Sequence, residues 1–208
     1  MDDFVKNNIK KDLILKVAKE RFARYGLKKT KMEEIAADLK MSKPTLYYYY
    51  QTKEQIYEEV LKYEIKEISN SLTEILNNES LSIEDKLSQY FKVVKNYFSE
   101  KSNLFQLQLD VLLMPNVMVP KSLYFKLIET EVEFLKALFS KILVKSKNKE
   151  DEVNFIARYL NSIARGILLI EKTDSEKGEN IFEKQETPPE NQWKFTIRIL
   201  LKEFSITD

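Results

Sequence analysis

Residues 41–54 read MSKPTLYYYYQTKE, and the rest of the chain is best interpreted outward from this stretch. Ser42 is suited to cap a helix, and Pro44 is tolerated in a first turn, where no intrahelical N–H donor is needed. Leu46 and Tyr50 lie four residues apart and share one face of that helix. The other face presents a cation, a hydroxyl and three phenols. These groups suit phosphate oxygens and base edges, although four tyrosines in a row also fit plain aromatic packing.

Two more cap signals flank this helix. Thr30 with Glu33 at the third position has the form of a capping box, and Thr52 with Gln55 has the related T-x-x-Q form. Together with Ser42 they predict a short helix, a tight turn and a second short helix. This is a helix-turn-helix, whose second helix lies in the major groove of DNA.

The composition predicts an all-α protein. The 208 residues are 43% hydrophobic and 32% charged, with only 3 Gly and 5 Pro. The chain has no His and no Cys, which excludes imidazole or thiolate catalysis and ordinary zinc sites. Only carboxylate, Lys or Tyr chemistry stays open to an enzyme, and the carboxylates show no metal-ligand spacing. We therefore expect no enzyme and no metal or cofactor site. No segment approaches the roughly 18 apolar residues of a membrane span, and the N-terminus lacks the apolar part of a signal peptide, so a cytoplasmic location is expected.

Positive charge is concentrated at the start of the chain. Residues 1–54 carry 13 Lys and Arg against 8 Asp and Glu, whereas residues 55–208 carry 21 against 25. An excess of this size fits nucleic-acid binding but also an ordinary solvated face.

Residues 9–60 resemble the DNA-binding domain of TetR-family transcriptional regulators. The resemblance rests on the Phe22-to-Gly26 helix end, Thr30, Ile35-Ala36, Ser42, Leu46-Tyr47, Tyr50 and Lys53-Glu54. The chain departs from the family at Lys40, where such regulators usually have glycine. A non-glycine residue in a left-handed turn costs on the order of 1 kcal/mol.

The resemblance implies a set of DNA-contacting residues. Lys43, Pro44, Thr45, Tyr47 and Tyr48 match the family's groove-facing positions. Thr30, Tyr49 and Lys53 match positions that hold the DNA backbone, Ser42 starts the helix, and Lys31 is an electrostatic helper. Leu46 and Tyr50 would be structural.

About nine helices are expected, in an N-terminal tail and DNA-binding domain over 1–54 and a helical ligand-binding and dimerisation domain over 55–208. The predicted helices are 9–25, 30–39, 42–50, 52–77, one from Ser82, 103–113, 121–144, 150–171 and 190–205. A loop of about 19 residues, 173–191, would separate the last two.

Aromatic and flexible apolar side chains in the larger domain are candidates for an effector pocket, as the resemblance implies. They are Tyr90, Tyr97, Phe98, Phe105, Met114 and Phe125, with the polar Gln108 and Asp110 among them. A core is the simpler explanation for each single apolar residue, and Asp110 would either face solvent or point inward to a partner such as a cationic ligand.

The last two predicted helices are apolar on more than one face. The resemblance implies that they pair with their copies in a second subunit through Ile156, Leu160, Ile163, Ile167, Trp193, Ile197, Leu200 and Phe204. The alternative is that this face belongs to the chain's own core.

The leading hypothesis is a homodimeric regulator, a repressor, that binds a pseudo-palindromic double-stranded operator and is released by a small apolar or amphipathic effector. The runner-up keeps the DNA-binding domain but gives the larger domain a protein partner and no small-molecule switch.

Overall fold

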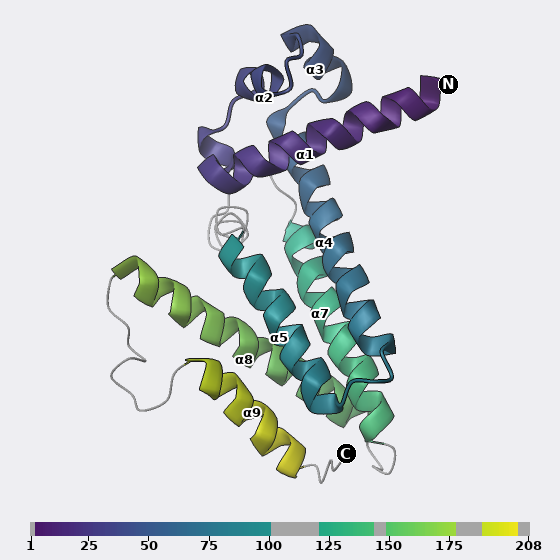
Figure 1. Cartoon of the computed structure of the whole chain (residues 1–208), viewed down its shortest axis with the longest axis vertical. Helices are drawn as coiled ribbons and strands as arrows, with labels where there is room; N and C mark the ends of the chain where they lie inside the picture. The colour runs from purple at the N-terminus through teal and green to yellow at the C-terminus, as the bar shows by residue number, and fades with distance from the viewer. Residues whose placement is uncertain (1–2, 101–120, 144–148, 178–188, 204–208) are drawn as a thin grey trace. The chain divides into compact units, whose positions relative to one another are not determined.

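The computed structural model describes residues 3–100, 121–143, 149–177 and 189–203 (Figure 1). These residues form eight helices and no strand, which confirms the all-α prediction. The helices are α1 (Asp3–Lys29), α2 (Met32–Asp38), α3 (Lys43–Tyr49), α4 (Lys53–Asn77), α5 (Ile83–Glu100), α7 (Lys121–Ile142), α8 (Lys149–Lys177) and α9 (Pro189–Glu203). The helix predicted over 103–113 lies outside the described residues. None of the described helices is long and apolar enough to span a membrane.

The chain divides into two compact units. The N-terminal unit comprises residues 1–66 and 100–126, and the C-terminal unit comprises 67–99 and 127–208. Helix α4 continues through the predicted domain boundary at 54/55 as far as Asn77. The division of the chain into functional domains 1–54 and 55–208 stays a prediction.

The core of the N-terminal unit forms where α1 crosses the start of α4 (Figure 1). Phe22 of α1 and Tyr57 of α4 are both fully buried and pack edge to face, with ring centroids 5.2 Å apart. Ile35 of α2 and Leu46 of α3 are fully buried as well. Each of the first four helices therefore contributes at least one large side chain to this core.

Helix α1 is interrupted at Gly26, whose φ of 73° and ψ of 165° are not helical. The prediction that Gly26 stops the helix is confirmed, because only glycine adopts this backbone conformation without strain. At the other end, α1 begins at Asp3, six residues before the predicted start.

The capping box of α2 is displaced by one residue from the prediction. The N-cap is Lys31, whose backbone N–H donates to the Glu34 carboxylate at 2.9 Å. Thr30 and Glu33 do not form the box. The Thr30 hydroxyl instead donates to the Gly26 carbonyl at 2.8 Å, across the break in α1.

The turn after α2 is a Schellman motif. The Lys40 N–H donates to the Ala37 carbonyl at 3.0 Å, and the Met41 N–H donates to the Ala36 carbonyl at 2.9 Å. Lys40 has a left-handed φ of 51°. The turn thus keeps the backbone geometry that usually selects glycine, with lysine in its place.

In the C-terminal unit, four helices meet around Tyr90 of α5. Its ring stacks on Phe134 of α7, with centroids 5.5 Å apart, and lies 6.1 Å from Trp193 of α9. Its hydroxyl accepts a hydrogen bond from Asn161 of α8 at 3.1 Å. Ser82 caps α5 by accepting from the Asp85 N–H at 3.0 Å, as predicted.

The connection between α8 and α9 is shorter than predicted, because α8 continues to Lys177 and α9 begins at Pro189. The first five residues of the predicted 173–191 loop are therefore helical. Residues 178–188 lie outside the described part of the chain.

Candidate nucleic-acid interface

Helix α3 starts as its sequence predicts. The Ser42 hydroxyl accepts from the Thr45 N–H at 3.3 Å and lies 2.6 Å from the Thr45 hydroxyl. Pro44 occupies the first turn, where its missing N–H costs nothing. Both hydroxyls are thereby tied to each other at the exposed start of the helix.

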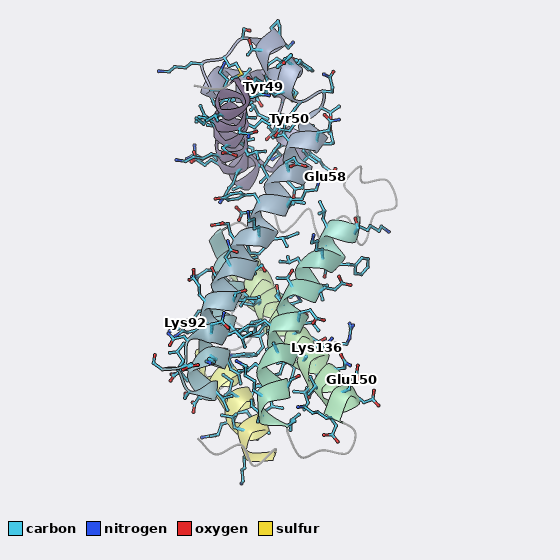
Figure 2. The ribbon with its side chains drawn as sticks, turned by 90° about the vertical axis from the view of Figure 1, so that its right-hand side faces the viewer. Tyr49, Tyr50, Glu58, Lys92, Lys136 and Glu150 are labelled. Carbon is cyan, nitrogen blue, oxygen red and sulfur yellow. The ribbon has the colours of Figure 1, made fainter. Side chains whose placement is uncertain are left out.

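The inner and outer faces of α3 are those predicted. Leu46 is fully buried and Tyr50 is 8% exposed, whereas Tyr48 is 77% exposed. Tyr47 and Tyr49 are half-buried, and Tyr48 packs edge to face on Tyr49 with centroids 5.3 Å apart. Figure 2 shows Tyr49 and Tyr50 where α3 joins α4. The four consecutive tyrosines thus divide into one anchor, Tyr50, and three that reach the surface.

The exposed lysine of α3 already has an acidic partner. The Lys43 ammonium forms an ion pair with Glu33 of α2. The hydrogen bond to Glu33 and the attraction between the two charges raise the pKa of Lys43, and the same hydrogen bond lowers the pKa of Glu33. Both side chains are exposed, so a DNA phosphate would compete with Glu33 for this ammonium in water.

Lys53 lies differently from the prediction based on the resemblance. Its ammonium donates to the carbonyls of Leu27 at 2.7 Å, Thr30 at 2.9 Å and Lys28 at 3.3 Å. An ammonium has three donors, and all three are used within the chain. The structure therefore gives Lys53 a role in holding the α1–α2 connection, and its contact with DNA stays a prediction.

Thr30 and Lys31, two of the predicted DNA-contacting residues, differ in their exposure. Thr30 is fully buried, and its hydroxyl is engaged by Gly26, while the Lys31 side chain is exposed. Of the two, only Lys31 offers its side chain to a ligand on the surface.

Two glutamines, Gln51 and Gln55, hold the end of α3. The sequence analysis predicted the Thr52 cap with Gln55 but not the contacts of Gln51. The Gln51 side chain donates to the Tyr47 carbonyl at 2.8 Å, and its backbone N–H donates to the Gln55 side-chain oxygen at 2.9 Å. Thr52 caps α4 as predicted, by accepting from the Gln55 N–H at 3.2 Å. In the predicted capping box the Gln55 side chain would accept from the Thr52 N–H, but it accepts from the Gln51 N–H instead. The spacing of the two glutamines, four residues apart on either side of Thr52, was the sequence signal that could have predicted this contact.

The predicted effector residues are only partly described. Tyr90 and Tyr97 are buried in the C-terminal unit, and Phe125, in the N-terminal unit, is 51% exposed. Phe105, Gln108, Asp110, Met114 and the Phe98 side chain lie outside the described residues.

A buried polar cluster surrounds Tyr90 and was not predicted. Asn161 donates to the Glu131 carboxylate at 2.6 Å as well as to Tyr90, and Arg165 pairs with Glu131 at 2.8 Å. Burial raises the pKa of Glu131, against the opposing effects of Arg165 and Asn161. The Trp193 indole N–H is also buried and has no acceptor among the described residues. Within the same residues, no group of three acidic side chains could hold a metal ion.

The predicted dimer residues lie mainly inside the chain. Ile156, Leu160, Trp193 and Ile197 are almost completely buried in the C-terminal unit, and Ile167 is buried as well. Ile163 and Leu200 are half-buried, and Phe204 lies outside the described residues. The structure buries these five side chains within the chain, as the alternative interpretation expects, and their part in a dimer stays a prediction.

Other apolar side chains of α8 and α9 face outward. They are Phe155, Tyr159, Leu169, Ile170, Phe195 and Ile199, each between 38% and 69% exposed. Phe155 and Tyr159 stack on each other with centroids 5.9 Å apart. We call these six side chains the α8–α9 apolar face.

Comparisons with known proteins agree with this geometry. Residues 14–60 match the family model described as bacterial regulatory proteins, tetR family. A TetR transcriptional regulator from Legionella pneumophila is 22% identical, with 88% of this chain and 94% of that one covered and a TM-score of 0.64. A putative fatty acid metabolism regulator from Clostridium perfringens is 21% identical over 91% and 96% of the two chains, with a TM-score of 0.62.

A third solved structure is that of FadR from Bacillus subtilis in complex with stearoyl-CoA. It is 13% identical, covers 90% of this chain and 95% of its own, and has a TM-score of 0.61. Comparison with curated protein sequences finds none that matches. Residues 14–60 therefore match the DNA-binding domain of the tetR family, and most of the chain shares its fold with solved TetR-family regulators, which supports a TetR-family transcriptional regulator.

Proposed function

We propose that this protein is a repressor that binds a pseudo-palindromic operator as a homodimer and is released by a small effector. The observation that carries the DNA-binding part is the outer face of α3. This face presents Tyr48 at 77% exposure on a helix that Ser42 caps and Leu46 anchors. A rigid, exposed helix with hydroxyl and ammonium donors is suited to base edges and phosphates in a major groove.

The test is selection of bound DNA from a random pool, followed by binding measurements on the selected site. Two half-sites with centres about 34 to 36 Å apart are expected, because two copies of α3 must reach successive major grooves on one side of the duplex. Tyr48→Ala should weaken binding about tenfold or more, corresponding to loss of one good contact. Tyr63→Phe is the control, since Tyr63 is also an exposed tyrosine of the N-terminal unit but lies on α4. Binding that does not decline with added salt would argue against any phosphate contacts.

The homodimer part of the proposal is supported by the α8–α9 apolar face. Its six large apolar side chains are exposed in the single chain, and a two-fold pairing through α8 and α9 would bury them. Exposed aromatic residues such as Phe155 and Phe195 are typical of such contacts.

Phe195→Glu tests the interface with a matched control. Phe195 is 53% exposed on α9, and Phe125 is 51% exposed on the part of α7 that belongs to the N-terminal unit. Sedimentation at micromolar concentration should show a dimer for the natural chain and for Phe125→Glu, and a monomer for Phe195→Glu. A natural chain that sediments as a monomer would remove the dimer from the proposal.

The effector part of the proposal rests on the C-terminal unit. Its core combines aromatic walls around Tyr90 with buried polar groups, and the Trp193 N–H is a buried donor that a ligand oxygen would satisfy. This mixture suits an amphipathic ligand, and stearoyl-CoA in the FadR complex is an amphipathic molecule. Long-chain acyl-CoA is therefore the first probe to add to a preformed DNA complex. If neither it nor any other small amphiphile alters DNA affinity, the protein-partner alternative takes its place.

A further inference from the structure

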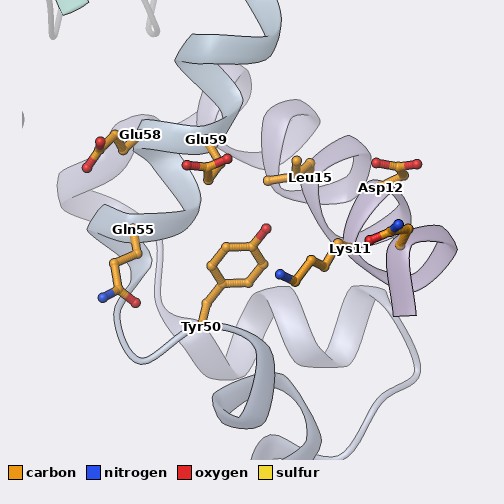
Figure 3. Close-up of a pocket in the computed structure, with 8 residues that line it drawn as sticks. Lys11, Asp12, Leu15, Tyr50, Gln55, Glu58 and Glu59 are labelled. Atoms are coloured by element: carbon orange, nitrogen blue, oxygen red, sulfur yellow. The ribbon is translucent and has the colours of Figure 1, made fainter. Parts of the chain in front are cut away.

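A pocket of about 480 Å³ opens in the N-terminal unit behind α3 (Figure 3). It lies between α1 and the first turns of α4, and Tyr50 closes one side. Its described lining residues are Asn8, Lys11, Asp12, Leu15, Tyr50, Gln55, Glu58 and Glu59. A volume of this size accommodates a small organic molecule.

Tyr50 is the central side chain of the pocket. It is 8% exposed, its ring stands between α1 and α4, and its hydroxyl points towards the side occupied by Glu59 and Leu15 (Figure 3). The hydroxyl has no hydrogen-bond partner among the described residues. Burial, and then the charges of Glu59 and Asp12, raise the pKa of the phenol above its ordinary value, at which the group is already uncharged at neutral pH.

The charge of the pocket is opposite to what DNA requires. Asp12, Glu58 and Glu59 line it together with one described cation, Lys11. Lys62 pairs with Glu58 at 2.9 Å and Glu59 at 2.8 Å, but Asp12 has no ion pair in the described structure. Even with Lys62 counted, negative charge is in excess. Phosphate would be repelled here, whereas a cation would be attracted.

The lining of this pocket suits an organic cation better than a metal ion, for two reasons. No three acidic side chains of the described chain converge closely enough to hold a metal. In addition, the Tyr50 ring and Leu15 offer apolar surface, which a bare ion does not use but an alkyl or aryl group does.

We propose that this pocket binds a small organic ammonium ion, whose charge faces Asp12 and Glu59 and whose apolar body lies against Tyr50 and Leu15. The site belongs to the DNA-binding unit and is separate from the effector site proposed above. Occupancy would also stiffen the end of α3, because two lining residues hold that end. The Tyr50 N–H donates to the Leu46 carbonyl at 3.0 Å, and the Gln55 side chain accepts from the Gln51 N–H at 2.9 Å.

The experiment uses three matched probes that share one body and differ in charge: 4-phenylbutylammonium, 4-phenylbutanol and 4-phenylbutyrate. Each is titrated into the full chain while the NMR signals of the Leu15 methyl groups and the Tyr50 ring are followed. The ammonium probe should bind most tightly and the carboxylate probe least. Equal binding of ammonium and carboxylate, or no shift at these signals with any probe, would overturn the proposal.

Two variants locate the charge contact. Asp12→Asn should weaken binding of the ammonium probe about twofold to fivefold, the range for a partly exposed ion pair. Glu20→Gln, an exposed carboxylate of α1 that does not line the pocket, should leave the affinity unchanged. If Asp12→Asn and Glu20→Gln behave alike, the assigned charge contact is wrong.

Amide hydrogen exchange tests the effect on α3. With the ammonium probe bound, exchange of the Tyr50 and Gln51 N–H groups should slow. Unchanged exchange at saturation would refute the link to α3. None of these measurements involves DNA or an acyl-CoA, so their failure is distinct from failure of the repressor proposal.

Discussion

Lys53 offers the sharpest test of how the N-terminal unit is held together. Its ammonium donates to the carbonyls of Leu27, Lys28 and Thr30, which connect the end of α1 to the start of α2. Lys53→Met keeps most of the apolar stem and removes the three donors. Two of the three bonds are partly buried and one is exposed. At about 1 kcal/mol for each partly buried bond and less for the exposed one, the unit should lose about 2 to 3 kcal/mol.

The assay is urea unfolding of the full chain, followed by two signals. The single tryptophan, Trp193, belongs to the C-terminal unit, so its fluorescence reports on that unit, whereas circular dichroism at 222 nm reports on all helices. The Lys53→Met variant should lose helical signal at lower urea while the fluorescence transition stays in place. Lys31→Met is the control, because Lys31 caps α2 through its backbone, and its exposed side chain should contribute less than about 0.5 kcal/mol.

DNA binding supplies the result that would refute this reasoning. A lysine that clamps a phosphate contributes about 0.9 to the slope of log affinity against log salt. If Lys53→Met reduces that slope by about this amount and leaves the unfolding curve unchanged, the ammonium serves DNA and the internal hydrogen bonds are not what hold the unit. If the slope stays and stability falls, Lys53 acts by positioning α2 and α3.

Three further predictions concern single positions. Lys40→Gly should raise the free energy of unfolding by about 0.5 to 1 kcal/mol in the same urea assay, because Lys40 has a left-handed φ of 51° that glycine adopts without strain; a decrease would show that the lysine side chain stabilises the turn. Ser42→Ala should cost about 1 kcal/mol through loss of the α3 cap, and Ser42→Thr should restore most of it. Burial raises the pKa of Glu131 above its value in the unfolded chain. The folded chain therefore binds more protons between the two pKa values, and stability should fall as pH rises through that interval. Glu131→Gln should flatten this dependence, measured by Trp193 fluorescence in urea at a series of pH values; a slope as steep as in the natural chain would contradict the assignment.

Local hydrogen bonds are the part of this structure that the sequence predicts well. The caps at Ser42, Thr52 and Ser82 each join residues three apart, so spacing alone determines them. One local error is the register of α2. Thr30 is the better capping residue by type, but its hydroxyl donates to the Gly26 carbonyl. The N-cap is therefore Lys31, whose backbone N–H donates to Glu34.

The sequence pattern does not predict contacts between helices. The Lys53 ammonium meets carbonyls more than 20 residues earlier in the chain, and Glu131 meets Asn161 and Arg165 across two helices. Nothing in the local pattern distinguishes a lysine that bonds carbonyls from one that is free to bind phosphate. The family resemblance supplies a position for Lys53, but the fold decides which partner its ammonium finds.

The two apolar faces of α8 are a second case in which the sequence pattern does not determine a contact between helices. Periodicity identifies both a face through Ile156 and Leu160 and a face through Phe155 and Tyr159, but it does not say which one points inward. The structure buries the first and leaves Phe155 69% exposed. The inward face also carries Asn161, which bonds Glu131 and Tyr90 and therefore cannot turn outward without leaving a buried carboxylate short of a donor. A polar residue within an apolar stripe thus fixes the rotation of the helix, and that rotation leaves Phe155 and Tyr159 on the surface, where the proposed second subunit would pack.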